Sequence, residues 1–209
     1  MPSRRRFPLL PSPWARAAHA VGLLLPLAAG TARADENLLR GPHPFRRDNQ
    51  VSAHVLVASG RADTMSGTKL AFDYNYKLTG GWSPLWLDLA VNAQHGACNS
   101  APSASACSPD TGEVYETLGG VRWMFVTPVP LVPYMGASAG FVFAFPNGAS
   151  AASGLAFRVV GGANYFFFDW LGVGGQVGYS LGGLSYDSTF KGSHTYAVLD
   201  FGGGLVFQF

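Results

Sequence analysis

The last fifteen residues, Thr195-Tyr-Ala-Val-Leu-Asp-Phe-Gly-Gly-Gly-Leu-Val-Phe-Gln-Phe209, alternate between two kinds of side chain. Odd positions are mostly apolar and end in Phe207 and Phe209, while even positions include Asp200 and Gln208. Successive side chains of a β-strand point to opposite faces, so the pattern predicts a strand with one apolar and one polar face. Its length suits a tilted strand that crosses a bilayer, which takes about 9–11 residues.

Seven earlier segments show the same alternation. They span residues 51–58, 69–78, 85–94, 115–125, 134–145, 155–167 and 173–181. Turn-forming residues separate them, no window keeps a helical periodicity, and an even strand number suits a bacterial single-chain barrel. We therefore predict an all-β protein with an eight-stranded antiparallel up-and-down transmembrane β-barrel over residues 50–209.

The predicted connections differ in length. Those after the second, fourth and sixth strands are short, whereas those at residues 60–67, 95–112, 146–154 and 185–194 are longer and rich in Ser, Gly, Ala and Pro. Outer-membrane barrels have short periplasmic turns and longer external loops. The four longer loops, above all 95–112, are therefore the expected contacts for an unknown external ligand or surface partner.

The two cysteines, Cys98 and Cys107, lie nine residues apart in the longest predicted loop. In an exported protein such a pair is most simply a disulfide. The alternative, a metal site that also uses His95, lacks the four ligands that structural zinc normally takes. We expect no metal or cofactor.

The first 34 residues have the features of a secretory signal peptide. Three arginines at residues 4–6 precede an apolar run over residues 17–30, and Ala32-Arg33-Ala34 forms a cleavage site. The alternative, a retained anchor, is less favoured because a spanning helix needs about 20 apolar residues. We expect cleavage, export to the cell outer membrane, and an irregular periplasmic lead-in over residues 35–49.

Removal of this segment reverses the charge balance. The remaining chain has 9 basic and 12 acidic residues, a net charge of −3, so the basic character of the full chain is mostly a targeting property. Nucleic-acid binding needs clustered Lys and Arg to neutralise phosphates, and no such cluster remains. We expect no nucleic-acid partner.

Alternation alone does not say which face is outside, because a soluble ligand-binding barrel would turn its apolar face inward. The small residues and few charges of the polar face suit the confined lumen of an eight-stranded barrel. Aromatic residues also gather at the strand ends, with Trp86 expected in one interfacial belt and Tyr196 in the other. We therefore place the apolar face against lipid.

The polar face then lines the lumen and contains ionisable residues of both signs. They are His54, Lys69, Asp73, Lys77, Asp88, Glu116, Arg122, Arg158 and Asp200. Unpaired charges in a low-dielectric lumen are costly, so we expect ion pairs and hydrogen bonds that close it. A narrow pore is the alternative, although eight strands leave room only for side chains.

The final strand resembles the assembly signal of outer-membrane barrels. It has a terminal Phe209, Phe207 and Leu205 at alternating positions, and Asp200 and Gly202 ahead of them. Residues 51–209 are similar to the small eight-stranded family typified by the transmembrane domain of outer membrane protein A and by outer membrane protein X. The resemblance implies contact with outer-membrane lipid, insertion by the barrel assembly machinery, and roles from envelope integrity to adhesion.

Some small barrels of this kind are lipid-modifying enzymes, which need a nucleophile with a base in reach. Ser193, His194 and Asp187 form a candidate set, but adjacent residues on a strand face opposite ways. The sequence therefore predicts a structural or surface-interaction barrel and no enzyme, with a lipid-modifying enzyme as a less favoured alternative.

Overall fold

The computed structural model describes residues 47–61, 64–78, 84–98, 112–125, 127–146, 151–186 and 193–209. The chain divides into two compact units, Met1–Glu36 and Asn37–Phe209, and every described residue belongs to the second. The predicted signal peptide and most of the predicted lead-in therefore lie outside the described residues. Within the described part of the chain, no helix is long and apolar enough to cross a membrane.

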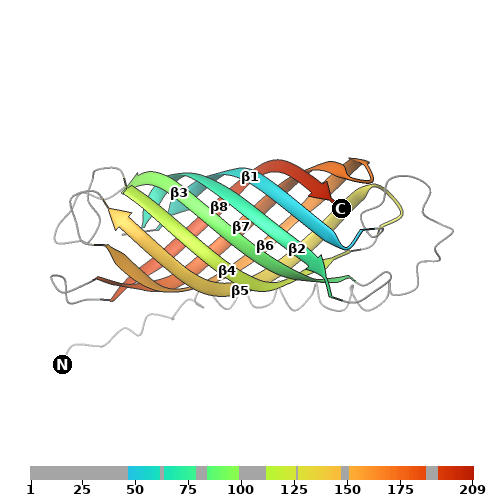
Figure 1. Cartoon of the computed structure of the whole chain (residues 1–209). Coiled ribbons are helices and arrows are strands. Elements are labelled where there is room, and N and C mark those ends of the chain that lie inside the picture. The colour runs from blue at the N-terminus through green and yellow to red at the C-terminus, as the bar shows by residue number, and fades with distance from the viewer. Residues whose placement is uncertain are drawn as a thin grey trace, which may run out of the picture. The chain divides into compact units, whose positions relative to one another are not determined.

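Eight strands account for almost all described residues. They are β1 (Asn49–Gly60), β2 (Met65–Lys77), β3 (Leu85–Cys98), β4 (Gly112–Met124), β5 (Leu131–Pro146), β6 (Ala152–Phe168), β7 (Leu171–Tyr186) and β8 (Ser193–Gln208). Each strand pairs antiparallel with its sequence neighbours, and β8 pairs with β1 to close the barrel (Figure 1). The predicted eight-stranded antiparallel barrel is confirmed.

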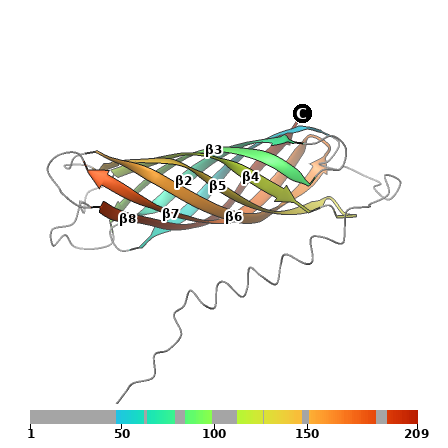
Figure 2. The ribbon, with the colours of Figure 1, turned by 90° about the horizontal axis from the view of Figure 1, so that it is seen from below.

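The strands are staggered as well as paired. Following paired residues from Val51 round all eight strands leads back to β1 at Arg61, ten residues further along. A closed sheet with such a stagger has strands tilted by roughly 35–45°. Front and back strands consequently cross in Figures 1 and 2.

The barrel has two distinct ends. Asn49, Phe209 and the connections after β2, β4 and β6 lie at the turn end, and the other four connections lie at the loop end. The strands reach beyond the predicted segments into the predicted loops. Residues 65–67, 95–98, 152–154, 185–186 and 193–194 are strand, because pairs such as Gly67 with Gly96 continue the ladder.

The predicted contrast between short turns and long loops is wrong for two of the predicted loops. Residues 61–64 join β1 to β2, fewer than the residues 78–84 that join β2 to β3, and residues 147–151 join β5 to β6, fewer than the residues 125–130 that join β4 to β5. The backbone N–H of Thr64 donates to the carbonyl of Arg61 at 3.0 Å, so the described ends of this connection are hydrogen-bonded to each other. Ser66 and Gly67, residue types typical of turns, belong to β2 instead.

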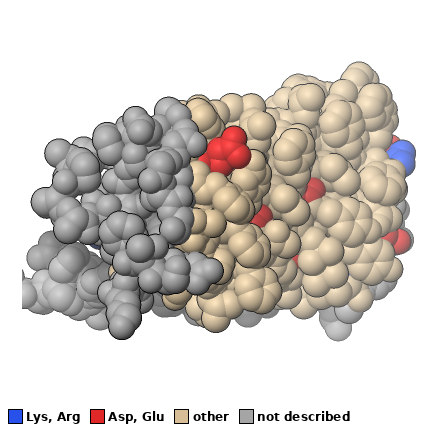
Figure 3. Space-filling view, turned by 60° about the vertical axis from the view of Figure 1, so that its left-hand side comes forward, with Lys and Arg blue, Asp and Glu red and all other residues tan. Residues whose placement is uncertain are grey.

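The outer face is apolar over most of its height. Val55, Phe141 and Phe157 are 59%, 57% and 62% exposed, and every strand contributes similar residues. Among the described side chains of the strands, two acidic or basic residues are exposed, His95 and Glu113. They lie opposite each other on β3 and β4, near the loop end. Figure 3 shows one side of this wall as a broad uncharged surface with isolated acidic groups.

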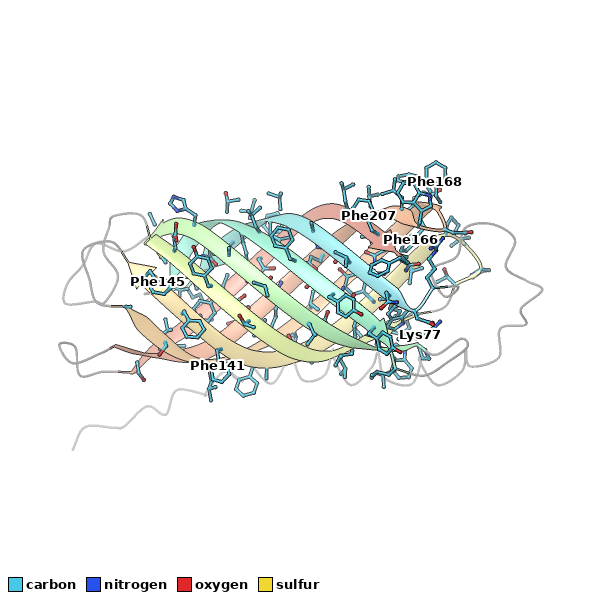
Figure 4. All side chains as sticks on the ribbon, viewed as in Figure 1. Lys77, Phe141, Phe145, Phe166, Phe168 and Phe207 are labelled. Atoms are coloured by element: carbon cyan, nitrogen blue, oxygen red, sulfur yellow. The ribbon has the colours of Figure 1, made fainter. Side chains whose placement is uncertain are left out.

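Aromatic side chains gather at both ends of the outer wall. At the turn end Trp170 stacks with Phe168 and with Phe207, with ring centroids 6.0 and 6.4 Å apart. Figure 4 labels Phe168 and Phe207 at this end of the barrel. The placement of Trp86 and Tyr196 in these belts is wrong. Their side chains are 0% and 1% exposed and face the lumen, because even positions on β3 and β8 point inward.

Candidate functional site: the lumen

All nine predicted lumen residues are buried, with exposed fractions from 0% for Lys69 and Asp200 to 6% for Asp73 and Lys77. The alternation of each strand places them on the inner wall, and the stagger of the sheet decides which of them meet. The structure brings eight of them into two separate groups and leaves Lys77 at the turn end.

The first group is the four-residue ion cluster of Lys69, Glu116, Arg158 and Asp200. Lys69 Nζ lies 2.6 Å from Glu116 Oε2 and 3.0 Å from Asp200 Oδ2. Arg158 donates to both carboxylate oxygens of Asp200, at 2.5 and 2.6 Å. Two positive and two negative formal charges balance, and the bidentate pair is the strongest form of this contact.

Neutral side chains complete the coordination of the four-residue ion cluster. Asn92 Nδ2 and the Tyr196 hydroxyl each donate to Glu116 at 2.8 Å, and Arg158 Nη1 donates to Ser180 Oγ at 3.1 Å. Together the contacts join six strands across the lumen. These three partners were not among the predicted lumen residues, although their alternation positions place them on the inner face.

A glycine makes room for the Arg158–Asp200 pair. A Cβ atom on Gly178 would lie 2.2 Å from Arg158 Nη2 and 2.8 Å from Asp200 Oδ1. Gly178 lies on β7, between the strands that carry the two charges, and pairs directly with Asp200. Any side chain at this position would occupy the space of the ion pair.

The second group is the turn-side cluster of His54, Asp73, Asp88 and Arg122. Arg122 Nη2 lies 3.0 Å from Asp88 Oδ1 and 3.5 Å from Asp73 Oδ1, and His54 Nδ1 lies 3.5 Å from Asp73 Oδ2. The Arg122 guanidinium also lies over the ring of Tyr134, 4.6 Å from its centroid. One guanidinium therefore holds two carboxylates, and the histidine is the fourth polar member.

A hydrogen-bonded chain of amide side chains continues from the turn-side cluster to the β1–β8 seam. Gln208 donates to Gln50 at 3.0 Å, Gln50 donates to Asn75 at 3.2 Å, and Asn75 donates to Asp88. The chain crosses the seam between β8 and β1.

Lys77 belongs to neither group. Its Nζ lies 2.7 Å from Asp48 Oδ1, whose side chain is 62% exposed, and 5.9 Å from the ring centroid of Trp86. It therefore forms its ion pair at the turn-end mouth of the barrel.

Apolar side chains lie at both ends of the lumen, which the sequence analysis did not foresee. The loop-end cap contains Val114, Val142, Leu184 and Val198. The turn-end cap contains Trp86, Met124, Val132, Phe166 and Val206. Most of these side chains are 0–3% exposed, and the least buried, Leu184, is 7% exposed, so the polar middle of the lumen lies between two packed apolar layers.

The residues of the predicted assembly signal divide between the two faces of β8. Leu205, Phe207 and Phe209 are 50%, 38% and 59% exposed on the outer wall, whereas Asp200 is fully buried. Gly202 pairs with β1 and β7. Their role in assembly stays a prediction.

Two other predicted sets are only partly described. Cys98 is the last residue of β3 and Cys107 lies outside the described residues, so the disulfide stays a prediction. Ser193 and His194 begin β8, but their side chains and Asp187 are not among those the structure describes. Within the described part of the chain, no group of three or more His, Cys, Asp or Glu residues could hold a metal ion.

Comparisons with known proteins agree on the fold. No protein-family model and no curated protein matches the chain. Neisserial surface protein A has a similar solved structure, with a TM-score of 0.57 and 16% identity over 77% of this chain and 96% of that chain. OprG, an outer membrane protein from Pseudomonas aeruginosa, has a TM-score of 0.53 and 11% identity over 82% and 99%. The chain thus has the fold of small eight-stranded outer-membrane barrels, as the sequence resemblance predicted.

Proposed function

We propose that the chain is an integral outer-membrane protein with a structural or surface-interaction role, exported by a cleaved signal peptide. The observation that carries this proposal is the inverted distribution of polarity. Apolar side chains cover the outer wall, and the described charged side chains of the strands, apart from Glu113 near the loop end, are buried inside. A soluble protein buries its apolar side chains, whereas a barrel in lipid exposes them.

The height of the apolar wall supports a membrane-spanning role. On β4 the outward-facing residues from Trp123 to Tyr115 are uncharged, and Glu113 is the first charged one. The ten residue steps from Trp123 to Glu113, at about 3.4 Å each and tilted by roughly 40°, place the first charged residue about 26 Å further along the barrel axis. This height agrees with the apolar band of outer-membrane barrels, about 25 Å.

The proposal includes a lumen that is closed by its own side chains. Ions would have to pass the loop-end cap, the four-residue ion cluster, the turn-side cluster and the turn-end cap in succession. Opening the path would expose buried charges that now neutralise one another, which is costly. This arrangement favours a plugged barrel over a narrow pore.

The surface role is assigned to the loop end. The connection from β3 to β4, residues 99–111, is the longest between two described strands and contains Cys107. External loops of a rigid barrel are where binding residues usually lie. Removal of residues 99–111 should abolish surface binding while a matched change in the 79–83 turn leaves it intact; unchanged binding would contradict this assignment.

Cell fractionation followed by gel migration with and without heating tests the location. We expect the protein in the outer-membrane fraction with heat-modifiable migration, whereas a soluble barrel would be recovered from the periplasm or the medium. Planar-bilayer recordings test the plug, since steady open channels would favour the pore.

A lipid-modifying enzyme is the alternative function. An assay of lipid products from membranes that contain the protein tests it. If the protein modified lipids and a Ser193→Ala variant did not, the enzyme would replace the structural or surface-interaction role as the proposed function.

A further inference from the structure

The apolar outer wall is much taller on β5 than on β1, and these two strands lie on opposite sides of the barrel (Figure 1). On β5 every outward-facing residue from Leu131 to Phe145 is apolar, which covers fourteen residue steps. On β1 the apolar outward-facing residues run from Val51 to Val57, six steps, between Asn49 and the exposed Ser59. At about 3.4 Å per step and a tilt of roughly 40°, the apolar wall is about 36 Å tall on β5 and about 16 Å tall on β1.

The neighbouring strands show the same difference. On β2 the apolar outward-facing residues run from Leu78 to Leu70, eight steps, and the exposed Thr68 follows. On β6, which lies opposite β2, they run from Phe167 to Leu155, twelve steps, before Ser153. The short side of the wall thus covers β1 and β2, and the tall side covers β5 and β6.

The tall side extends beyond the short side at both ends. A row of paired residues leads from Val57 across four strand pairs to Phe145. The stagger of the sheet raises such a row by about 3.3 Å per strand toward the loop end, so Phe145 lies about 13 Å above Val57. At the turn end, Leu131 lies about 8 Å below Val51 on the same basis. A tilt of the barrel could align one end of the two sides but not both ends.

The short side does not match an ordinary bilayer. The hydrocarbon core of a bilayer is about 30 Å thick on average and somewhat thinner in the bacterial outer membrane. The tall side is sufficient to cover it, whereas an undisturbed bilayer would immerse Ser59 and Thr68 on the short side. Lipids respond to an apolar surface that is too short by thinning around it.

We propose that the protein thins the bilayer beside β1 and β2 and leaves it at ordinary thickness beside β5 and β6. The partner of the short side is therefore a compressed patch of lipid, in which headgroups and water approach the middle of the barrel wall more closely. This patch adjoins the seam where β8 pairs with β1. The inference rests on the proposed location in the outer membrane and adds an asymmetry of the lipid contact to it.

Spin labels at matched heights on opposite walls test the proposal. Ser59 and Phe143 lie within about 3 Å of the same height near the loop end, as do Asn49 and Leu131 near the turn end. Each residue is replaced by a labelled cysteine in a variant without the two native cysteines, reconstituted in vesicles of dimyristoylphosphatidylcholine. Electron paramagnetic resonance then compares collisions with oxygen, which concentrates in hydrocarbon, and with a water-soluble nickel chelate.

At the loop end, we expect the ratio of oxygen to nickel collisions to be several-fold higher for Phe143→Cys than for Ser59→Cys. At the turn end, the ratio for Leu131→Cys should likewise exceed that for Asn49→Cys. Equal ratios within both pairs would overturn the proposal in favour of a uniform bilayer, and differences of opposite sign at the two ends would overturn it in favour of a tilted barrel. Low ratios at all four sites would contradict the membrane location itself.

A series of bilayer thicknesses provides a second test that needs no label. Ser59→Leu extends the short side by one outward position, whereas Ser153→Leu, the matched control, extends β6, where the wall is already tall. Both variants, once heat-modifiable migration shows that they fold, are unfolded with urea in phosphatidylcholine vesicles of increasing chain length. The gain in stability of Ser59→Leu over the wild type should grow with thickness, while that of Ser153→Leu stays constant. An equal dependence on thickness in the two variants would refute the proposal.

Discussion

Gly178 offers a sharp test of the lumen, because a single methyl group there should break a buried ion pair. The added Cβ of Gly178→Ala would lie 2.2 Å from Arg158 Nη2 and 2.6 Å from Cζ. Contacts this short force the guanidinium to move, and both of its bonds to Asp200 depend on its present position. The substitution changes no charge, so its effect reports on geometry alone.

The expected loss follows from the bonds at risk. A hydrogen bond to a charged group contributes about 1.5–3 kcal/mol, and a buried pair broken at one partner costs about 3–5 kcal/mol. Because Lys69 remains beside Asp200, we expect the lower part of this range, about 3 kcal/mol of unfolding free energy. Gly183→Ala is the matched control on the same strand, since its Cβ meets nothing within 4 Å. It should be neutral or stabilise by up to about 1 kcal/mol, as glycine is unfavourable in a strand.

Urea unfolding of the protein in lipid vesicles, followed by tryptophan fluorescence, measures both variants. If Gly178→Ala loses no more stability than Gly183→Ala, the reasoning is refuted. A double-mutant cycle adds a second check. In an Arg158→Met background the same Gly178→Ala change should cost much less, because the guanidinium that it displaces is gone.

Three further predictions concern the other parts of the barrel. Arg122→Met should reduce the unfolding free energy by about 3–5 kcal/mol in the same assay, because it leaves two buried carboxylates without their cation; a loss under about 1 kcal/mol would contradict the turn-side cluster. Val177→Arg, at mid-height on the outer wall, should cost about 2–4 kcal/mol and Ser153→Arg, near the loop end, about 0–1 kcal/mol; equal costs would argue against a lipid-facing wall. Phe209→Ala should lower the heat-modifiable fraction assembled in cells while refolding of the purified protein in detergent stays normal, and a normal assembled fraction would remove Phe209 from the assembly signal.

Strand periodicity predicted the inward or outward direction of most side chains, because the period of two holds along most of each strand. It breaks at the irregularity of β6, where the adjacent Phe167 and Phe168 are both exposed. Asp73 and Lys69 on β2, and Arg158 on β6, lie where the alternation places them. The same rule also contained the correct answer for Trp86 and Tyr196. Their even positions indicate the lumen, and the general preference of aromatic residues for membrane interfaces led to the wrong side.

The partners inside the lumen could not be predicted in the same way. Lys69 meets Glu116 on β4 and Asp200 on β8, neither of which pairs with β2 in the sheet. The ten-residue stagger decides which side chains lie at the same height along the barrel axis. That stagger depends in turn on the registers of all eight strand pairs. A shift of two residues in one pair would preserve the alternation and still separate these charges.

The apolar caps are visible in the sequence, although they were not predicted from it. Inner-face positions near strand ends are apolar, as with Val114 and Leu184 at the loop end and Met124 and Val206 at the turn end. Within its own strand, each of these residues is a single apolar residue on an otherwise polar face. An apolar layer is indicated only when such residues occur at the same end of several strands.

Closure of the barrel explains why so many lumen contacts involve β8. The β1–β8 pairing joins residues as far apart as Gln50 and Gln208, so it has the largest chain entropy to overcome of any strand pair. Three interior contacts brace this seam: Gln208 binds Gln50, Lys69 on β2 reaches over β1 to Asp200, and Arg158 holds Asp200 from the other side. A buried carboxylate at Asp200 is thus satisfied only when strands on both sides of the seam are in place. This buried charge therefore makes an unclosed sheet unfavourable, which couples the polar lumen to the completion of the fold.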